Sequence, residues 1–257
     1  MCIRDRDYGW RIDGRLVSFV DEDFFALPTS IGQHIDRATC AASSELRAAV
    51  LGEFDSVLEF LDRCYHDTCA SFREGVDHDL TAGAERVLRW LLDAEVQVVF
   101  ASNAPAEKII DWFGAHDFEV VDGRSTEPGS APLRVYGRAG KQDVGGPATR
   151  RFGGREIHVD RPTYRAILER EAADLVVGDV LSLDLATPLH LRAEGAAGAP
   201  RAVGVMHLRH TPSWVLDAVG PAPDQVDHLV PHITALPRLV SALGARPRAP
   251  QAPAPRG

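Results

Sequence analysis

The stretch that decides the fold is LVVGDVLSLD, residues 175–184. A short apolar run ends here in Gly178-Asp179, and a second acid, Asp184, follows a few residues later. Short apolar runs bounded by a turn of this kind are typical of buried strands. The stretch therefore predicts a strand that presents two carboxylates, those of Asp179 and Asp184, at its carboxyl end.

Strands and helices alternate along the rest of the chain. Apolar runs predict strands at 16–20, 96–101, 118–121, 175–177 and 203–208, and apolar stripes with helical spacing predict helices at 81–92, 106–113, 163–171 and 236–243. This alternation predicts an α/β fold with a doubly wound parallel sheet and helices on both faces. Residues 122–154, rich in Gly, Pro, Ser and Arg, are expected to be irregular or to form a β-excursion around 133–136.

The chain divides into a core, an insert and a tail. Two apolar stripes with helical spacing run between residues 31 and 73, which predicts an all-helical insert. We therefore assign residues 14–23 and 79–244 to the α/β core and residues 24–78 to a small helical cap. The tail at 245–257 is rich in Pro, Ala and Arg and is expected to be disordered.

Composition narrows the class of protein. The 257 residues include 28 Lys and Arg against 37 Asp and Glu, a formal net charge of −9, which argues against nucleic acid as a partner. No apolar run approaches the ~20 residues that cross a bilayer, so no membrane partner is expected. The charged start lacks the apolar segment of a secretory signal, and the 4 cysteines do not make a disulfide framework. We therefore expect a cytoplasmic protein of undetermined oligomeric state.

Ligands of parallel sheets bind at the carboxyl ends of the strands, which directs attention to the acids after residue 178. Carboxylate oxygens are the ligands that Mg²⁺ prefers, so Asp179 and Asp184 are candidates for a magnesium site. In the alternative interpretation, Asp179 caps the following helix and Asp184 is a solvated helix residue.

Two further polar groups are candidates for binding an anion. Ser102 and Asn103 close the strand at 96–101, where a hydroxyl and free N–H groups before a helix can bind phosphate oxygens, or where they serve only as an N-cap. Arg161 precedes the helix proline Pro162 and is a candidate cation, unless it is a solvated residue of an ordinary helix start. Lys141 competes with Arg161 for the same role.

Three of these motifs occur in a characteristic order: VQVVFASN at 96–103, RPTYRAIL at 161–168 and LVVGDVLSLD at 175–184. Together they resemble the haloacid dehalogenase (HAD) superfamily of hydrolases over roughly residues 79–243. The resemblance implies a Rossmann-like phosphoryl-transfer fold in which an aspartate attacks phosphorus and Mg²⁺ offsets the charge.

The resemblance also implies roles for particular residues. Ser102 would match the hydroxyl motif of the family, Arg161 or Lys141 the cation motif, and Asp179 with Asp184 the acidic motif. The last strand and the closing helix, at 203–208 and 236–243, also look like those of the superfamily.

The first motif of the family is an apolar strand ending in Asp-x-Asp, usually followed by a small pair of residues. Here the best match is LVSFVDED at 16–23, with Asp21 as nucleophile and Asp23 as general acid/base, but Phe24 and Phe25 follow. Two aromatic residues fit poorly in a loop that must approach phosphate closely, and such residues more often belong to a core. The resemblance places this strand at the centre of the sheet, between the strands at 96–101 and 175–177.

A rival interpretation makes residues 21–23 an acidic turn that caps a helix. The nucleophile strand then lies upstream and is missing from this chain, so that both neighbouring strands lose a partner. The opening MCIRDR resembles a spurious translation start, which agrees with this interpretation.

The leading hypothesis is a HAD-like hydrolase, a Mg²⁺-dependent phosphatase that acts on a small phosphorylated substrate through an aspartyl-phosphate. Asp21 and Asp23 would act on the substrate and would hold Mg²⁺ together with Asp179 and Asp184, while the Ser-Asn pair at 102–103 would bind the phosphoryl group. The alternative is a catalytically inactive or truncated HAD-like module that acts as a binding domain or is only a fragment. The substrate is not determined by the sequence.

Overall fold

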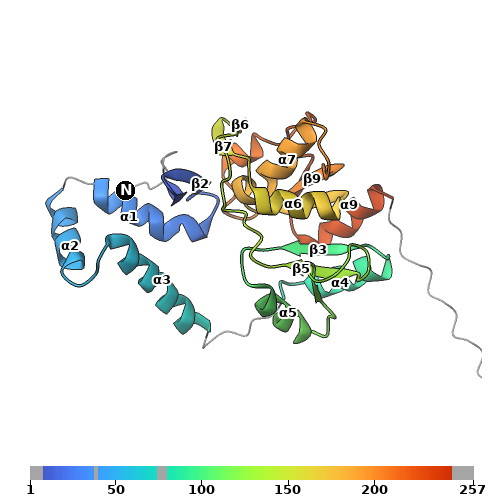
Figure 1. Ribbon diagram of the computed structural model, residues 1–257, viewed down its shortest axis with the longest axis horizontal. Helices are drawn as coiled ribbons and strands as arrows, with labels where there is room; N and C mark the ends of the chain where they lie inside the picture. The colour runs from blue at the N-terminus through green and yellow to red at the C-terminus, as the bar shows by residue number, and fades with distance from the viewer. Residues whose placement is uncertain (1–7, 38–39, 74–79, 245–257) are drawn as a thin grey trace, which may run out of the picture.

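Figure 1 shows the computed structural model, which describes residues 8–37, 40–73 and 80–244. A β-hairpin comes first in the chain, an arm of three helices follows, and the remainder forms an α/β body. The elements of the hairpin and the arm are β1 (Gly9–Ile12), β2 (Arg15–Phe19), η1 (Phe24–Ala26), α1 (Leu27–Arg37), α2 (Ala41–Leu51) and α3 (Val57–Arg73).

The α/β body contains two parallel sheets of three strands, in the orders β3-β5-β4 and β10-β9-β8. Their strands are β3 (Val98–Ala101), β4 (Val121–Asp122), β5 (Leu133–Tyr136), β8 (Leu175–Gly178), β9 (Ala202–Met206) and β10 (His228–Val230), and a separate hairpin consists of β6 (Thr149–Phe152) and β7 (Arg155–His158). The helices are α4 (Ala84–Asp93), α5 (Ala106–Gly114), α6 (Pro162–Glu171), η2 (Leu181–Leu185), α7 (Ala186–Ala193), α8 (Ser213–Leu216), η3 (Ile233–Ala235) and α9 (Leu236–Ala242). The predicted α/β class with parallel strands is confirmed.

One strand has a different place from the one expected. The region around 133–136, predicted as a β-excursion, is β5, the central strand of its sheet, and its residues are all buried. The prediction was wrong because the long stretch of Gly, Pro, Ser and Arg around it concealed a strand of 4 residues. The strands predicted at 96–101, 175–177 and 203–208 occur as β3, β8 and β9.

The expected central position of LVSFV is also wrong. This segment forms β2, which pairs antiparallel with β1 and does not join β3 or β8. Asp13 and Gly14, between the two strands, have φ angles of 50° and 77°. Two consecutive residues with positive φ are typical of the tight turn that Asp-Gly favours in β-hairpins. The local hairpin therefore gives this apolar strand a partner before it can enter the sheet.

The arm is helical, as expected for residues 31–73, and its small core is formed by Ile35, Val50 and Val57. Of the eight large apolar side chains that are exposed in the described ranges, seven lie in this region: Phe24, Phe25, Leu27, Leu46, Leu51, Leu58 and Phe72. The expectation that the two adjacent phenylalanines lie in a core is wrong, because they are 60% and 70% exposed. No helix in the part of the chain that the structure describes is long and apolar enough to cross a membrane.

Helix α6 packs against both sheets of the body. Its Ile167 contacts Ala101 of β3, while its Leu168 packs in a cluster that includes both Ala101 and Val176 of β8. Near its start, the Tyr164 hydroxyl donates to the carbonyl oxygen of Asp184 at 2.9 Å. The sheets therefore share a helix, although no strand in the described ranges joins them.

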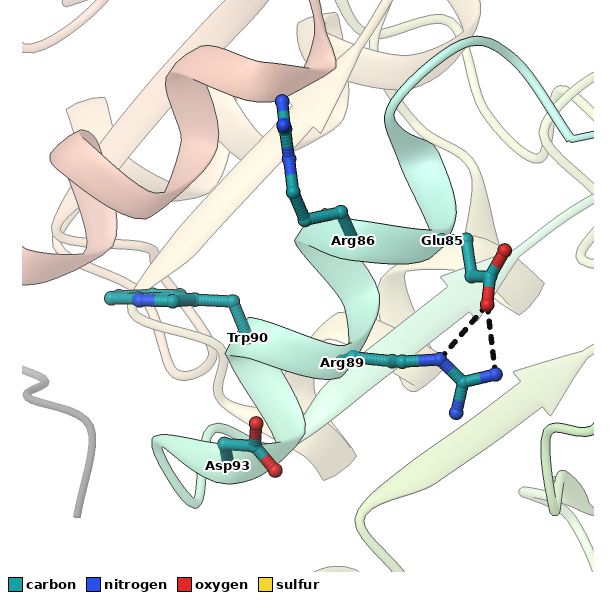
Figure 2. Close-up of a pocket in the computed structure, with 5 residues that line it drawn as sticks. All are labelled: Glu85, Arg86, Arg89, Trp90 and Asp93. Carbon is teal, nitrogen blue, oxygen red and sulfur yellow. Dashed lines mark hydrogen bonds and ion pairs between the residues drawn. The ribbon is translucent and has the colours of Figure 1, made fainter. Parts of the chain in front are cut away.

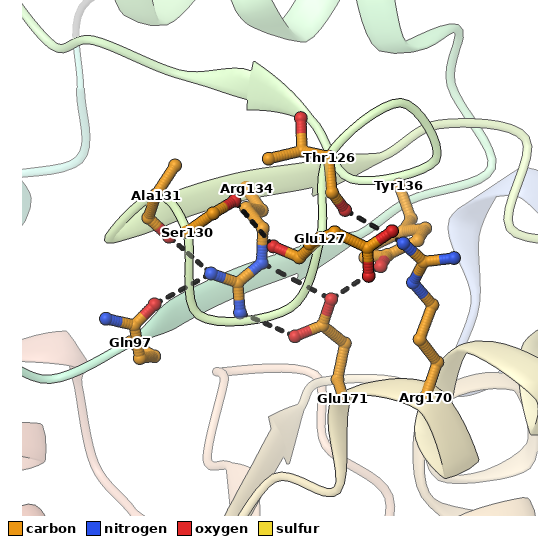
Figure 3. A network of polar contacts seen from close by, with 9 residues as sticks. All are labelled: Gln97, Thr126, Glu127, Ser130, Ala131, Arg134, Tyr136, Arg170 and Glu171. Carbon is orange, nitrogen blue, oxygen red and sulfur yellow. Dashed lines mark hydrogen bonds and ion pairs between the residues drawn. The ribbon is translucent and has the colours of Figure 1, made fainter.

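A buried ion pair ties the end of α6 to β5 (Figure 3). Arg134 of β5 donates from Nη2 to Glu171 Oε2 at 2.5 Å, and the two side chains are 2% and 5% exposed. The Tyr136 hydroxyl donates to the same carboxylate, and Arg134 also donates to Gln97 Oε1 at 2.7 Å. Although burial alone would raise the pKa of Glu171, the contacts with Arg134 and Tyr136 lower it. The carboxylate is therefore charged and fully partnered.

We predict that Arg134→Met lowers the free energy of unfolding by about 3–5 kcal/mol, because it leaves the Glu171 carboxylate buried without its cation. Urea denaturation measures the change. The matched control is Arg89→Met, which breaks the exposed pair with Glu85 and should cost less than about 1 kcal/mol. Equal losses in the two variants would contradict the importance of the buried pair.

Candidate functional site

The carboxyl ends of β3, β5 and β8 bring several predicted residues together. Asn103, after β3, accepts a hydrogen bond through Oδ1 from the backbone N–H of Lys141 at 3.0 Å. Lys141, in the loop after β5, donates from Nζ to Asp184 Oδ1 at 2.8 Å. The carbonyl oxygen of Ser102 accepts from Ala139 in the same loop at 2.8 Å. We call the group Ser102, Asn103, Lys141, Asp179 and Asp184 the rim.

Asp184 closes the turn that follows β8. Its Oδ2 accepts hydrogen bonds from the backbone N–H groups of Asp179 and Val180 at 3.1 and 3.0 Å. A Cβ atom on Gly178 would lie 2.3 Å from the Cβ of Asp184, so only glycine permits this approach. The alternative in which Asp184 is a solvated helix residue is wrong, because Asp184 is buried and caps the turn itself.

The two rim carboxyls respond to each other and to the lysine. Burial, followed by the negative charge of Asp184, raises the pKa of Asp179 to about 6. Burial alone would also raise the pKa of Asp184, but the charge and hydrogen bond of the Lys141 ammonium lower it. Asp184 is therefore the carboxylate that Lys141 neutralises, and Asp179 is the more easily protonated of the two.

Asp21 does not point to the rim. Its Oδ2 accepts from Arg155 Nη2 at 2.6 Å and from Trp214 Nε1 at 3.2 Å. The Arg155 guanidinium also lies over the rings of Phe19 and Trp214, at 4.5 and 4.8 Å from their centres. Asp21 is therefore held between β7 and α8, away from the contacts of Asp184.

Asp23 has the capping role of the rival interpretation. It accepts from Ser18 Oγ at 2.6 Å and from the backbone N–H of Phe25 at 2.9 Å, at the start of η1. Burial raises its pKa, and the negative charge of Asp184 adds to the increase. Asp23 is thus the member of the acidic triplet that lies within the electrostatic influence of the rim.

The sequence interpretation missed Glu22, whose side chain is fully buried. The Glu22 carboxyl accepts from the hydroxyl of Ser182 and, at 3.2 Å, from the backbone N–H of Ser182 in η2. Burial raises its pKa to about 8. Only its place between two aspartates gave a signal, since neighbours in an extended segment point to opposite sides.

Arg161 is a structural residue here. It is buried and donates to the carbonyl oxygens of Gln142 at 3.1 Å and of Val17 at 3.0 Å. Burial lowers its pKa to about 10. Lys141, and not Arg161, is therefore the cation that the structure places beside the rim acids.

The predicted magnesium ligands do not form one site. Asp21 is bound to Arg155, Asp23 caps η1, and Asp184 is bound to Lys141. Among the residues that the structure describes, no group of three or more His, Cys, Asp or Glu side chains is arranged to hold a metal ion. The predicted set of Asp21, Asp23, Asp179 and Asp184 thus does not fit Mg²⁺ in this fold.

Two surface hollows lie elsewhere on the body. One, of about 510 Å³, runs along α4 beside Trp90 and the ion pair of Glu85 with Arg89 (Figure 2). The other, of about 390 Å³, lies between α6 and the end of β5 and is lined by Arg124 and Arg170 among others. Neither hollow is lined by a rim residue.

We predict that stability falls as pH rises from about 4.5 to about 8, because folded Glu22 keeps a proton over this range that unfolded Glu22 releases. One such proton contributes a slope of about 1.4 kcal/mol per pH unit. Urea denaturation at several pH values measures it. Glu22→Gln should remove this component, whereas the exposed control Glu45→Gln should retain it; an unchanged slope in Glu22→Gln would refute the assignment.

Comparisons with protein-family models, with curated proteins and with solved structures gave no significant match. The interpretation of the site therefore rests on its own geometry and on the motifs of the sequence.

Proposed function

We propose that this chain is a HAD-like α/β module that acts as a protein-binding domain and, in the fold described above, does not hydrolyse phosphate monoesters. The single observation that carries the proposal is the separation of the acids. Asp21, the expected nucleophile, is held by Arg155 and Trp214, while Asp184 is held by Lys141 at the rim.

The motif order supports the HAD-like part of the proposal. The Ser-Asn pair at 102–103, the loop lysine and the Gly-Asp turn lie at the carboxyl ends of parallel strands, where ligands of doubly wound sheets bind. A full HAD core also requires a strand between β3 and β8, and β2 does not occupy that position.

The charge of the rim argues against an independent phosphate site. Lys141 is the one lysine or arginine that donates to Asp184, and Asp179 and Asp23 lie close enough to Asp184 for its charge to raise their pKa values. A phosphate oxygen approaching Lys141 would have to displace a carboxylate that is already hydrogen-bonded. The ammonium is thus already neutralised within the protein.

The exposed apolar side chains of the arm support the protein-binding part. Scattered apolar residues are ordinary on a surface, but a concentration of large ones marks an interaction site. Phe24, Phe25 and Phe72 are each at least 60% exposed, and all belong to the arm region.

A Mg²⁺-dependent phosphatase remains the second candidate, and one observation favours it. Asp23 is close enough to Asp184 for the two charges to interact, so the acidic triplet does reach the rim with one of its members. In that case Asp23, rather than Asp21, would be the residue of the triplet nearest to the substrate.

We predict no turnover of p-nitrophenyl phosphate with Mg²⁺ above the level of the Asp179→Asn variant, because no aspartate of the triplet is both free and at the rim. Release of p-nitrophenol from folded protein measures the reaction. Turnover that is lost in both Asp179→Asn and Asp23→Asn, but is kept in Asp21→Asn, would establish the phosphatase and overturn the proposal.

We also predict that Lys141→Met creates a dependence of stability on Mg²⁺, because it removes the cation that balances Asp184. Saturating Mg²⁺ should raise the Tm of this variant, by about 2–4 °C for each kcal/mol of binding, and leave the unmodified protein unchanged. Lys108→Met, at the other lysine of the chain, is the control. Equal stabilisation of all three proteins would show that Lys141 does not act as the counter-ion.

A further inference from the structure

Strand β3 has one edge without a partner. It lies at the end of its sheet, and the backbone N–H groups of Val98 and Ser102 donate to β5 at 2.8 and 2.9 Å. Because backbone groups of a strand alternate between its two edges, those of Val99 and Ala101 face the opposite side.

Strand β8 has the same property. The carbonyl oxygen of Asp174 accepts from Ala202 of β9 at 2.9 Å, so the backbone groups of Leu175 and Val177 face away from β9. In the ranges that the structure describes, no backbone hydrogen bond pairs these edges of β3 and β8 with another strand.

The side chains of both strands are those of interior strands. Apolar residues in unbroken succession, here VVFA and LVVG, are typical of parallel strands that are covered on both faces and paired on both edges. Yet every residue of β3 and β8 is only half-buried, whereas every residue of β5 is buried. The composition of the two strands therefore exceeds the burial that an edge position gives them.

Helix α6 fixes the distance between the two edges. Its Leu168 lies in one cluster with Ala101 of β3 and Val176 of β8, so both strands pack beneath a single helix. A helix with its side chains is about 10 Å wide, and this is also about the width of two strand spacings. The space between the edges therefore corresponds to one missing strand.

We propose that β3 and β8 together form a slot that accepts one extended segment of a second polypeptide, aligned parallel to both strands. The segment is apolar on both of its faces and about five residues long, to match the strands beside it. Its backbone would complete two ladders at once, which is stronger than addition to a single sheet edge. This inference rests on the proposed binding function and names the chemistry of its partner.

The rest of this chain offers no such segment. The apolar strand β2 is paired with β1, and its Val17 and Phe19 are buried. The segments outside the described ranges contain no run of four apolar residues, and residues 245–257 include four prolines, which cannot donate to a ladder. The occupant is accordingly a different polypeptide.

A labelled nonapeptide with five central valine and isoleucine residues, flanked by lysines, tests the slot in fluorescence anisotropy with the whole chain. We expect saturable binding of one peptide per protein. The same peptide with alternate backbone nitrogens methylated keeps the side chains but loses the donors, and should bind at least tenfold more weakly. Equal binding of the two peptides, or no binding to protein shown by circular dichroism to be folded, would overturn the proposal.

Hydrogen exchange locates the bound peptide. We expect slower exchange at the amides of Val99 and Val177, which face the slot, and no change at Val98, which is already paired. The variant Phe24→Ser/Phe25→Ser should bind the peptide equally well, since its changes lie on the arm.

Loss of binding in that variant, or protection of the slot amides by self-association without peptide, would overturn the assignment of a second polypeptide to the slot. Failure of these tests leaves the absence of phosphatase activity untouched, so the two proposals are judged separately.

Discussion

The packing of α6 against two separate sheets is the constraint on which the α/β body depends. Ile167 and Leu168 cover β3 and β8 from one side, Tyr164 bonds to the turn after β8, and Glu171 bonds to Arg134 of β5. A sheet with a shared central strand would hold its halves together through backbone hydrogen bonds. Here side-chain contacts of one helix have that task, and this explains why a buried, fully partnered ion pair stands at its end.

The acidic triplet shows how a change of pairing redirects chemistry. Once β2 turns back on β1, residues 21–23 emerge beside η2 and β7 and not at the centre of a sheet. Asp21 then meets Arg155, Glu22 meets Ser182, and Asp23 caps η1. Three acids that the motif would assign to a reaction instead dock the hairpin on the body.

The sequence predicted the class of the fold and part of the site. Apolar runs located β3, β8 and β9, and the positions after them gave the rim, because parallel strands bring their carboxyl ends to one edge. The path of β2 was missed, since the apolar pattern says where a strand is and not which strand it pairs with; the Asp13-Gly14 turn carried that information. The choice between Arg161 and Lys141 needed the three-dimensional path of the loop after β5.

The phenylalanines on the arm also have a consequence for the behaviour of the protein in bulk. Molecules with a net charge of −9 repel one another, which keeps the exposed aromatic surfaces of the arms apart in dilute buffer. Dissolved ions shorten the reach of this repulsion to about 10 Å at 0.1 M ionic strength, while the attraction between apolar surfaces persists. The colloidal stability of the protein is therefore set by ionic strength as much as by concentration.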